Sequence, residues 1–163
     1  MLAKTIATFF GSGLAPKAPG TFGTLAAIPV VVLLHQLQFS WLLAPLTLLA
    51  IFGGVWATAH YLKQSGQSGD PKEVVIDEVA GVWLLFSIMP LYHLPASYDM
   101  AGAMYLMGFV AFRFFDILKP WPISVIDRRM KGAWGIMLDD LAAALFGVAA
   151  LGILGHLWMA FAA

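Results

Sequence analysis

The stretch VVIDEVAGVWLLF, residues 74–86, decides the fold class because it places Asp77 and Glu78 at the head of a long apolar run. The chain repeats this pattern in IMLDDLAAALFG, residues 136–147, where Asp139 and Asp140 precede small and apolar residues. Charged side chains are costly inside a membrane, so they usually face the interior of a helix bundle and mark a functional site. Two such stretches predict two apolar helices that carry acids to one site.

The composition of the chain is that of a membrane protein. Hydrophobic residues make up 61% of its 163 residues and charged residues 11%, against about 25% charged residues in soluble domains. The absence of cysteine excludes disulfides and thiolate metal ligands. No Gly/Ser-rich linker divides the chain, so we expect a single domain over residues 1–163.

Five apolar segments follow one another along the chain, and each is expected to form a helix. The first two could form two membrane spans or a re-entrant hairpin, because polar residues weaken the end of the first. The predicted fold is all-α, a helical membrane protein of about five apolar helices with a polar site on the cytoplasmic side. The expected segments are residues 23–39, 41–62, 75–91, 97–115 and 136 to the C-terminus.

Threading five spans through a bilayer separates the charges. One side of the membrane receives residues 1–22, 63–74 and 113–135, and all nine Lys and Arg residues fall on that side. The positive-inside rule makes it the cytoplasmic side. The third, fourth and fifth segments then bring five acids to their cytoplasmic ends: Asp77, Glu78, Asp116, Asp139 and Asp140.

A simpler explanation exists for each acid alone. The helix macrodipole stabilises an acid in the first turn by about 0.3–1 kcal/mol, and Asp116 could pair with Arg113 or Lys119, each three residues away. For the whole set this explanation weakens, because adjacent anions on two helices repel unless a cation lies between them. Small residues beyond each acidic pair, including Gly81 and Gly147, would let the two helices approach closely. Oxygen ligands without Cys or a nearby His suit Mg²⁺ better than Zn²⁺.

Two further segments have features of an anion site. Residues 112–135 are rich in Lys and Arg, which fits a phosphate subsite beside the acids, although topology and attraction to anionic lipid explain some of these charges. In GSGLAPKAPGTFGTL, residues 11–25, the glycines permit unusual backbone angles and Lys17 adds positive charge. This loop could accept an anion at a helix start, but ordinary capping explains the same pattern.

Taken in order, GSGLAPKAPGTFGTL, VVIDEVAGVWL, FRFFDILKPWPI and GIMLDDLAAA resemble the bacterial phosphatidylglycerophosphatase A family. The resemblance spans most of the chain. It implies a largely helical fold in the bacterial inner membrane and Mg²⁺-dependent hydrolysis of phosphatidylglycerophosphate to phosphatidylglycerol and inorganic phosphate. The charged motif positions that it carries over are Asp77, Glu78, Arg113, Asp116, Lys119, Asp139 and Asp140.

We assign roles to these residues from their chemistry. Some of the five acids would hold Mg²⁺, which would polarise the phosphoryl group and lower the pKa of bound water. Arg113, Lys119 and Arg128 would neutralise the phosphate oxygens, with Lys17 as a further phosphate ligand. An acid that does not bind the metal could take the proton from water. Direct attack by water is favoured over an aspartyl-phosphate route because the chain lacks the Asp-x-Asp-x-Thr/Val signature.

Two alternatives belong to other classes of protein. A cation transporter would also carry acids within the membrane, and a non-enzymatic lipid-binding protein would need only the basic loop. The transporter is disfavoured because the acids lie near one end of the spans, and the lipid-binding protein because it needs no acidic pairs. The expected partners are therefore a phospholipid substrate and the membrane, with no nucleic acid.

Overall fold

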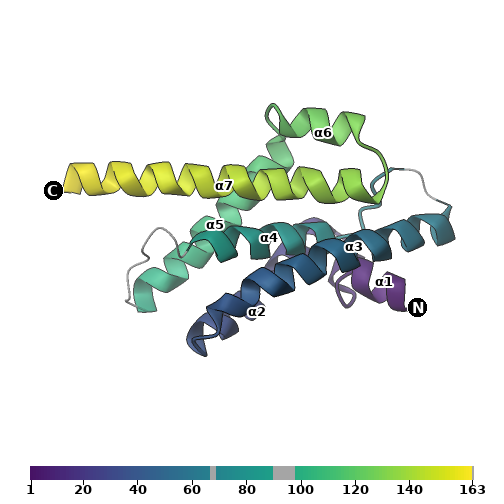
Figure 1. The fold of residues 1–163 in the computed structure, drawn as a ribbon, viewed down its shortest axis with the longest axis horizontal. Helices are drawn as coiled ribbons and strands as arrows, with labels where there is room; N and C mark the ends of the chain where they lie inside the picture. Colours follow the sequence, from purple (N-terminus) through teal and green to yellow (C-terminus); the bar gives the residue numbers. More distant parts are fainter. Residues whose placement is uncertain (67–68, 90–97, 163) are drawn as a thin grey trace.

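The computed structural model of the chain describes residues 1–66, 69–89 and 98–162, and none of these lies in a β-strand (Figure 1). The all-α prediction is therefore confirmed for this part of the chain. The helices are α1 (Leu2–Ala7), α2 (Pro19–Gln36), α3 (Leu43–Ser65), α4 (Ile76–Ile88), α5 (Tyr98–Leu118), α6 (Ile123–Arg129) and α7 (Ala133–Ala162), with 3-10 turns η1 (Ser12–Leu14) and η2 (Ser40–Leu42).

Five of these helices correspond to the five expected apolar segments. The helix α2 begins four residues earlier than expected, because Pro19 stands in its first turn, where proline needs no N–H partner. The helices α1 and α6 were not predicted. They have 6 and 7 residues, which is shorter than the window of about 11–18 residues in which hydrophobic periodicity is read.

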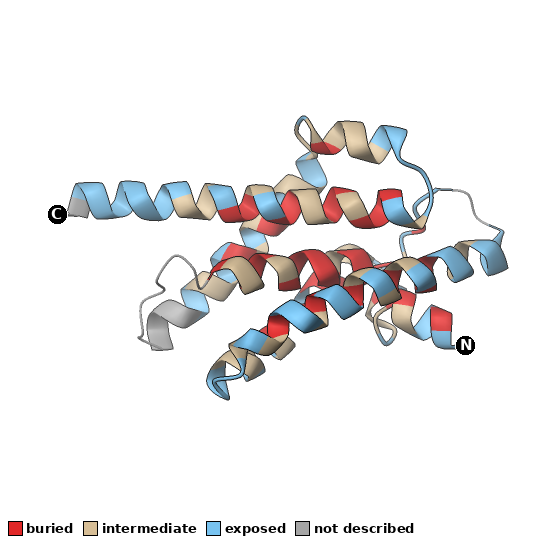
Figure 2. Cartoon of the chain, in the orientation of Figure 1, coloured by how far each residue is buried: buried red, intermediate tan, exposed pale blue. Residues whose placement is uncertain are grey.

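The helix α4 lies at the centre of the molecule and packs against α2, α3, α5 and α7. Nine of its 13 residues are buried, and Figure 2 shows it as the most continuously buried helix of the bundle. A helix that is apolar on all sides belongs in a core. Its acidic first turn is thus placed between the helices that surround it.

Three helical segments are long and apolar enough to cross a membrane, namely residues 19–36, 40–65 and 133–161. We expected five such segments, so the count by length and composition is lower in the described part of the chain. The helix α4 spans only about 20 Å at 1.5 Å per residue, less than a hydrocarbon core of about 30 Å. The expected turn at residues 92–97 lies outside the described residues. Residues 23–62 form two helices that each reach spanning length, which fits two spans.

Glycine lets α4 and α7 approach closely, as expected from the small residues beyond the acidic pairs. A Cβ atom on Gly81 would lie 2.5 Å from Cε2 of Phe112 and 3.1 Å from the carbonyl oxygen of Asp140. A Cβ atom on Gly147 would lie 2.9 Å from Cδ1 of Leu85. No larger side chain fits at either position without a shift, so the approach of α4 to α7 depends on these residues.

Candidate active site

A charged cavity of about 320 Å³ lies where the start of α2, the loop before α4, α4 itself, the end of α5 and α7 meet. Apart from Ile117 and Val74, its lining residues are charged side chains or small residues and prolines at the start of α2 and in the loop before α4. The structure thus brings most of the charged motif positions together at one cavity. The charged lining residues are Asp70, Lys72, Asp77, Glu78, Arg113, Asp116, Lys119 and Asp140.

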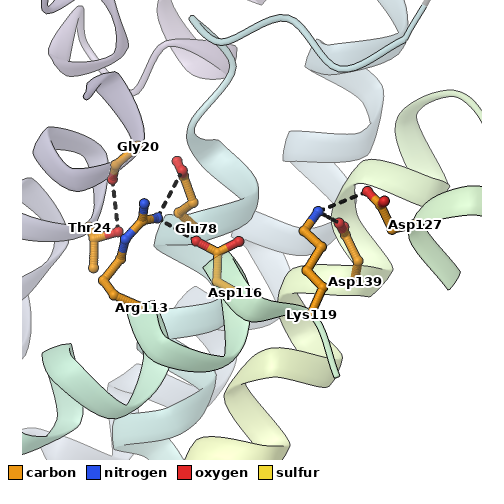
Figure 3. Close-up of polar contacts among 8 residues, drawn as sticks. All are labelled: Gly20, Thr24, Glu78, Arg113, Asp116, Lys119, Asp127 and Asp139. Carbon is orange, nitrogen blue, oxygen red and sulfur yellow. Dashed lines mark hydrogen bonds and ion pairs between the residues drawn. The ribbon is translucent and has the colours of Figure 1, made fainter. Parts of the chain in front are cut away.

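Arg113 joins α4 to α5 at this cavity (Figure 3). Its Nη1 atom donates a hydrogen bond to Oε1 of Glu78 at 3.3 Å and a second one to Oδ2 of Asp116. All three side chains are mostly buried. The pairing of Asp116 with Arg113, one of the simpler explanations considered for this acid, is therefore present, and it sits inside the cavity.

Lys119 joins the end of α5 to α6 and α7 (Figure 3). Its Nζ atom donates to Oδ1 of Asp127 at 2.8 Å and to Oδ2 of Asp139. Burial lowers the pKa of Lys119, but the hydrogen bonds to Asp127 and Asp139 outweigh this and raise the pKa above its ordinary value. The hydrogen bond from Lys119 likewise lowers the pKa of Asp127. The backbone of Lys119 has φ of 41°, a conformation that non-glycine residues hold only when their surroundings impose it.

The remaining two acids have no basic partner. Asp77 and Asp140 are only 5% and 4% exposed, and neither forms an ion pair with any described residue. One carboxylate oxygen of Asp77, and one each of Glu78 and Asp139, is buried without a hydrogen-bond partner. A buried anion without a partner is strongly destabilising. The cavity is therefore short of positive charge.

The macrodipole does not account for the second acidic pair. Asp77 and Glu78 do stand in the first turn of α4. Asp139 and Asp140 were expected to occupy the same place in the last helix, but α7 begins at Ala133, so its first turn contains no acid. The dipole effect falls off within the first turn, and the expectation of equivalent positions was wrong.

The donor set fits a magnesium ion by its chemistry. Within the described residues, no three His, Cys, Asp or Glu side chains are grouped closely enough to hold a metal ion together. Mg²⁺, however, is usually bound by one or two carboxylates, several waters and the phosphates of its substrate. Asp77 and Asp140 line the same cavity from the packed helices α4 and α7, and neither has an ion-pair partner among the described residues. They would supply the two carboxylates that such a site needs.

Two glycines of the N-terminal loop and α2 serve a purpose that the sequence did not indicate. We expected them to permit unusual backbone angles, but Gly20 and Gly23 lie in regular helix. A Cβ atom on Gly20 would lie 2.0 Å from Oε1 of Glu78, and one on Gly23 would lie 3.2 Å from Oε2 of Glu78. Gly20 therefore gives Glu78 its space, whereas Gly23 makes room chiefly for Val75, whose Cβ atom would lie 2.5 Å from the added one. The left-handed conformations belong to Gly11 and Ala18, with φ of 93° and 48°.

Two predicted phosphate ligands are absent from the lining of this cavity. Lys17 and Arg128 are exposed and do not line it. The Nε atom of Arg128 donates to the carbonyl oxygen of Ser124 at 2.9 Å, within α6. The phosphate binding of these two residues stays a prediction.

One acid of the cavity, Asp70, was missed by the sequence analysis. The residue as a whole is exposed, yet it lines the cavity, and burial and then the negative charge of Asp139 raise the pKa of its carboxyl group to about 6. Asp70 stands in a loop, whereas the acids were sought on apolar helices. Its position seven residues before Asp77 was the only feature of the sequence that could have indicated Asp70 as a site residue.

The fold and the cavity define a helical membrane protein with a cavity lined by acidic and basic side chains between its helices. Residues 5–155 match the family model described as phosphatidylglycerophosphatase A, and the chain belongs to that family. The resemblance seen in the sequence is thereby confirmed, and with it the prediction of a lipid phosphatase.

Individual relatives support the same placement. The chain is 37% identical over 153 residues to phosphatidylglycerophosphatase A of Escherichia coli, covering 94% of this chain and 83% of that protein. It is 34% identical over 143 residues to phosphatidylglycerophosphatase A of Haemophilus influenzae, covering 88% and 82%. It is also 38% identical over 149 residues to a Bacteroides thetaiotaomicron protein whose name proposes phosphatidylinositol-3-phosphatase activity, covering 89% and 88%. No solved structure is a significant match.

Proposed function

We propose that this chain hydrolyses the terminal phosphate monoester of phosphatidylglycerophosphate, giving phosphatidylglycerol and inorganic phosphate in phospholipid synthesis. Two named relatives carry this activity in their names. The observation that carries the proposal is the cavity itself, in which Arg113 and Lys119 lie beside acids that lack a cation. No feature of the described residues or of the relatives' names supports the cation transporter considered above.

The proposal includes a magnesium ion held by Asp77 and Asp140. When bound, the ion would polarise the phosphoryl group and supply an activated water. Arg113 and Lys119 neutralise the phosphate oxygens as charge develops on them. Water attacks the phosphorus and gives its proton to a carboxylate that holds no metal, such as Asp116. The bond from phosphorus to the glycerol oxygen breaks, and that oxygen takes the proton from the same carboxylate, which yields the free alcohol and inorganic phosphate.

We also propose that the cavity faces the cytoplasm from the inner membrane of a bacterium. The N-terminus, the loop before α4, and α6 lie at one end of the bundle, and the C-terminus lies at the other (Figure 1). All nine Lys and Arg residues belong to the first group of segments or to the adjoining helix ends, which supports a cytoplasmic location for that end. Reporter fusions after Gly66 and at the C-terminus should report opposite sides of the membrane; the same side for both would refute this orientation.

Phosphate release by the purified protein tests the reaction. We expect release from phosphatidylglycerophosphate in the presence of Mg²⁺, its loss on chelation and its return when Mg²⁺ is added back. Phosphatidylinositol 3-phosphate is the second substrate, because one relative's name points to it. No release from phosphatidylglycerophosphate would refute the proposed reaction, whereas full turnover in metal-stripped protein would refute only the role of the metal.

A further inference from the structure

A second hollow of the molecule is an apolar groove of about 450 Å³ between α5 and α7. All of its lining residues are apolar, and they include Leu106, Val110 and Phe114 on α5 and Leu151 and Leu154 on α7. Most of these side chains are exposed. The groove is therefore an open channel for an apolar molecule along the outside of the bundle.

The two helices form this groove because they touch at one place and then diverge. At Gly147 a Cβ atom would lie 3.6 Å from the backbone of Ala111 and of Phe112, so the helices meet backbone to backbone there. The ring of Phe115, which lines the groove, packs against the ring of Phe146 with centroids 5.6 Å apart. The hollow then extends along α5 and α7 away from the site.

Ile117 connects the groove to the charged cavity. It lines the cavity and is 66% exposed. Phe114 and Val110 precede it by three and seven residues, a spacing that places all three on one face of α5. An apolar stripe thus leads from the edge of the cavity into the groove, and it covers about 16 Å from Ile117 to Leu106 at 1.5 Å per residue.

The cavity therefore has two different edges. Asp70 and Lys72 form a polar edge on the loop before α4, and Ile117 forms an apolar edge on α5. A molecule that fits both the cavity and its apolar edge has an anionic head and an apolar tail. Such a molecule would enter from the side of α5, with its head among the charged residues.

We propose that the groove between α5 and α7 holds one acyl chain of the phospholipid whose phosphate group occupies the charged cavity. This inference rests on the proposed function and adds the path by which the lipid reaches the site. The acyl chain leaves the cavity over Ile117, passes Phe114 and Val110, and ends near Leu106 and Leu154. The groove then selects for chain length as well as for an apolar tail.

The variant Val110→Trp tests the groove, because Val110 is exposed and a larger ring there fills the hollow without disturbing the core. We expect the KM for long-chain phosphatidylglycerophosphate to rise about tenfold, as when about two methylene groups lose their burial, with little change in kcat. The dihexanoyl analogue should show a much smaller rise, because its chains are too short to reach Val110, about 10 Å from Ile117 along α5.

The matched control is Leu49→Trp, which places the same ring on an exposed apolar position of α3 and should leave both KM values unchanged. Equal rises in KM for the long-chain and dihexanoyl substrates, or equal changes in KM in the two variants, would show that the groove does not bind an acyl chain. An inactive wild-type protein would instead refute the proposed reaction.

Crosslinking tests the groove without any turnover. A phosphatidylglycerophosphate with a diazirine at the end of one acyl chain should label residues 106–114 of the wild-type protein, and Val110→Trp should remove that label. Equal labelling of the groove and of residues 48–52 on α3 would mean that lipid only surrounds the protein, and the inference would fall.

Discussion

The two acidic pairs look alike in sequence, but in each pair the two acids have different partners. Glu78 pairs with Arg113 and Asp139 pairs with Lys119, whereas Asp77 and Asp140 have no ion-pair partner among the described residues. A macrodipole would act on both members of a pair, and it does not reach the pair on α7. The comparison teaches that each pair contains one acid with an ion-pair partner and one acid without such a partner among the described residues, and the second is the acid that our proposal gives to a metal ion.

Removing the two unpaired charges should have the largest effect. Asp77→Asn and Asp140→Asn should each lower phosphate release from phosphatidylglycerophosphate by about 10²–10³-fold or more, the scale on which one preorganised electrostatic contact acts in an active site. The proteins should insert normally, because each variant also removes a buried uncompensated anion. Asp99→Asn, at the opposite end of α5, should keep the wild-type rate. Near-normal turnover in both Asp77→Asn and Asp140→Asn would show that the two acids without ion-pair partners are not required for the reaction.

For an acid that has an ion-pair partner, removing the basic partner should lower the stability of the protein. Lys119→Ala leaves the buried Asp139 without a partner, which should cost about 3 kcal/mol of stability, at the low end for breaking a buried pair because Lys119 is partly exposed. Thermal unfolding in detergent measures this change. The double variant Lys119→Ala with Asp139→Asn should regain most of the loss. A double variant as unstable as Lys119→Ala would show that Asp139 is not the acid that Lys119 satisfies.

The space beside Glu78 should matter for activity more than for stability. In Gly20→Ala the new Cβ would stand 2.0 Å from Oε1 of Glu78 and 3.2 Å from Nη1 of Arg113, so the carboxylate must shift and its hydrogen bond with Arg113 is disturbed. We expect a loss of about ten- to a hundredfold in turnover, as for other displacements of about 1 Å in an active site. Gly53→Ala in α3 is the control, since no atom lies within 4 Å of its Cβ position, and it should stabilise the helix by up to about 1 kcal/mol. Similar turnover in both variants would remove Gly20 from the site.

The smallest expected effect is the change in protein stability with pH that Asp70 causes. Its pKa rises from 3.8 to about 6 in the folded protein, so the folded state binds the proton more tightly than the unfolded state. Stability therefore falls as pH rises between these two values, and the full cost is present above the higher one. Asp70→Asn should unfold at a higher temperature than the wild-type protein at neutral pH, and the difference should vanish near pH 4. A difference independent of pH would contradict the burial of this carboxyl group.

The sequence predicts much of this molecule because its signals are strong and local. Long apolar runs locate α2, α3, α5 and α7, and two acids on an apolar helix point to a site whatever the detailed packing. The short helices α1 and α6 carry no readable periodicity. Asp70 stands in a loop, and the need for Gly20 arises only when α2 approaches Glu78. These features depend on contacts between distant segments, which one sequence does not display.

Binding of Mn²⁺, followed by electron paramagnetic resonance as a stand-in for Mg²⁺, tests the central claim most directly. The wild-type protein should bind Mn²⁺ without substrate, Asp77→Asn and Asp140→Asn should lose this binding, and Asp139→Asn should keep most of it because Lys119 already pairs with Asp139. Wild-type Mn²⁺ affinity in both Asp77→Asn and Asp140→Asn would contradict the account, since the two unpaired acids would then hold no metal.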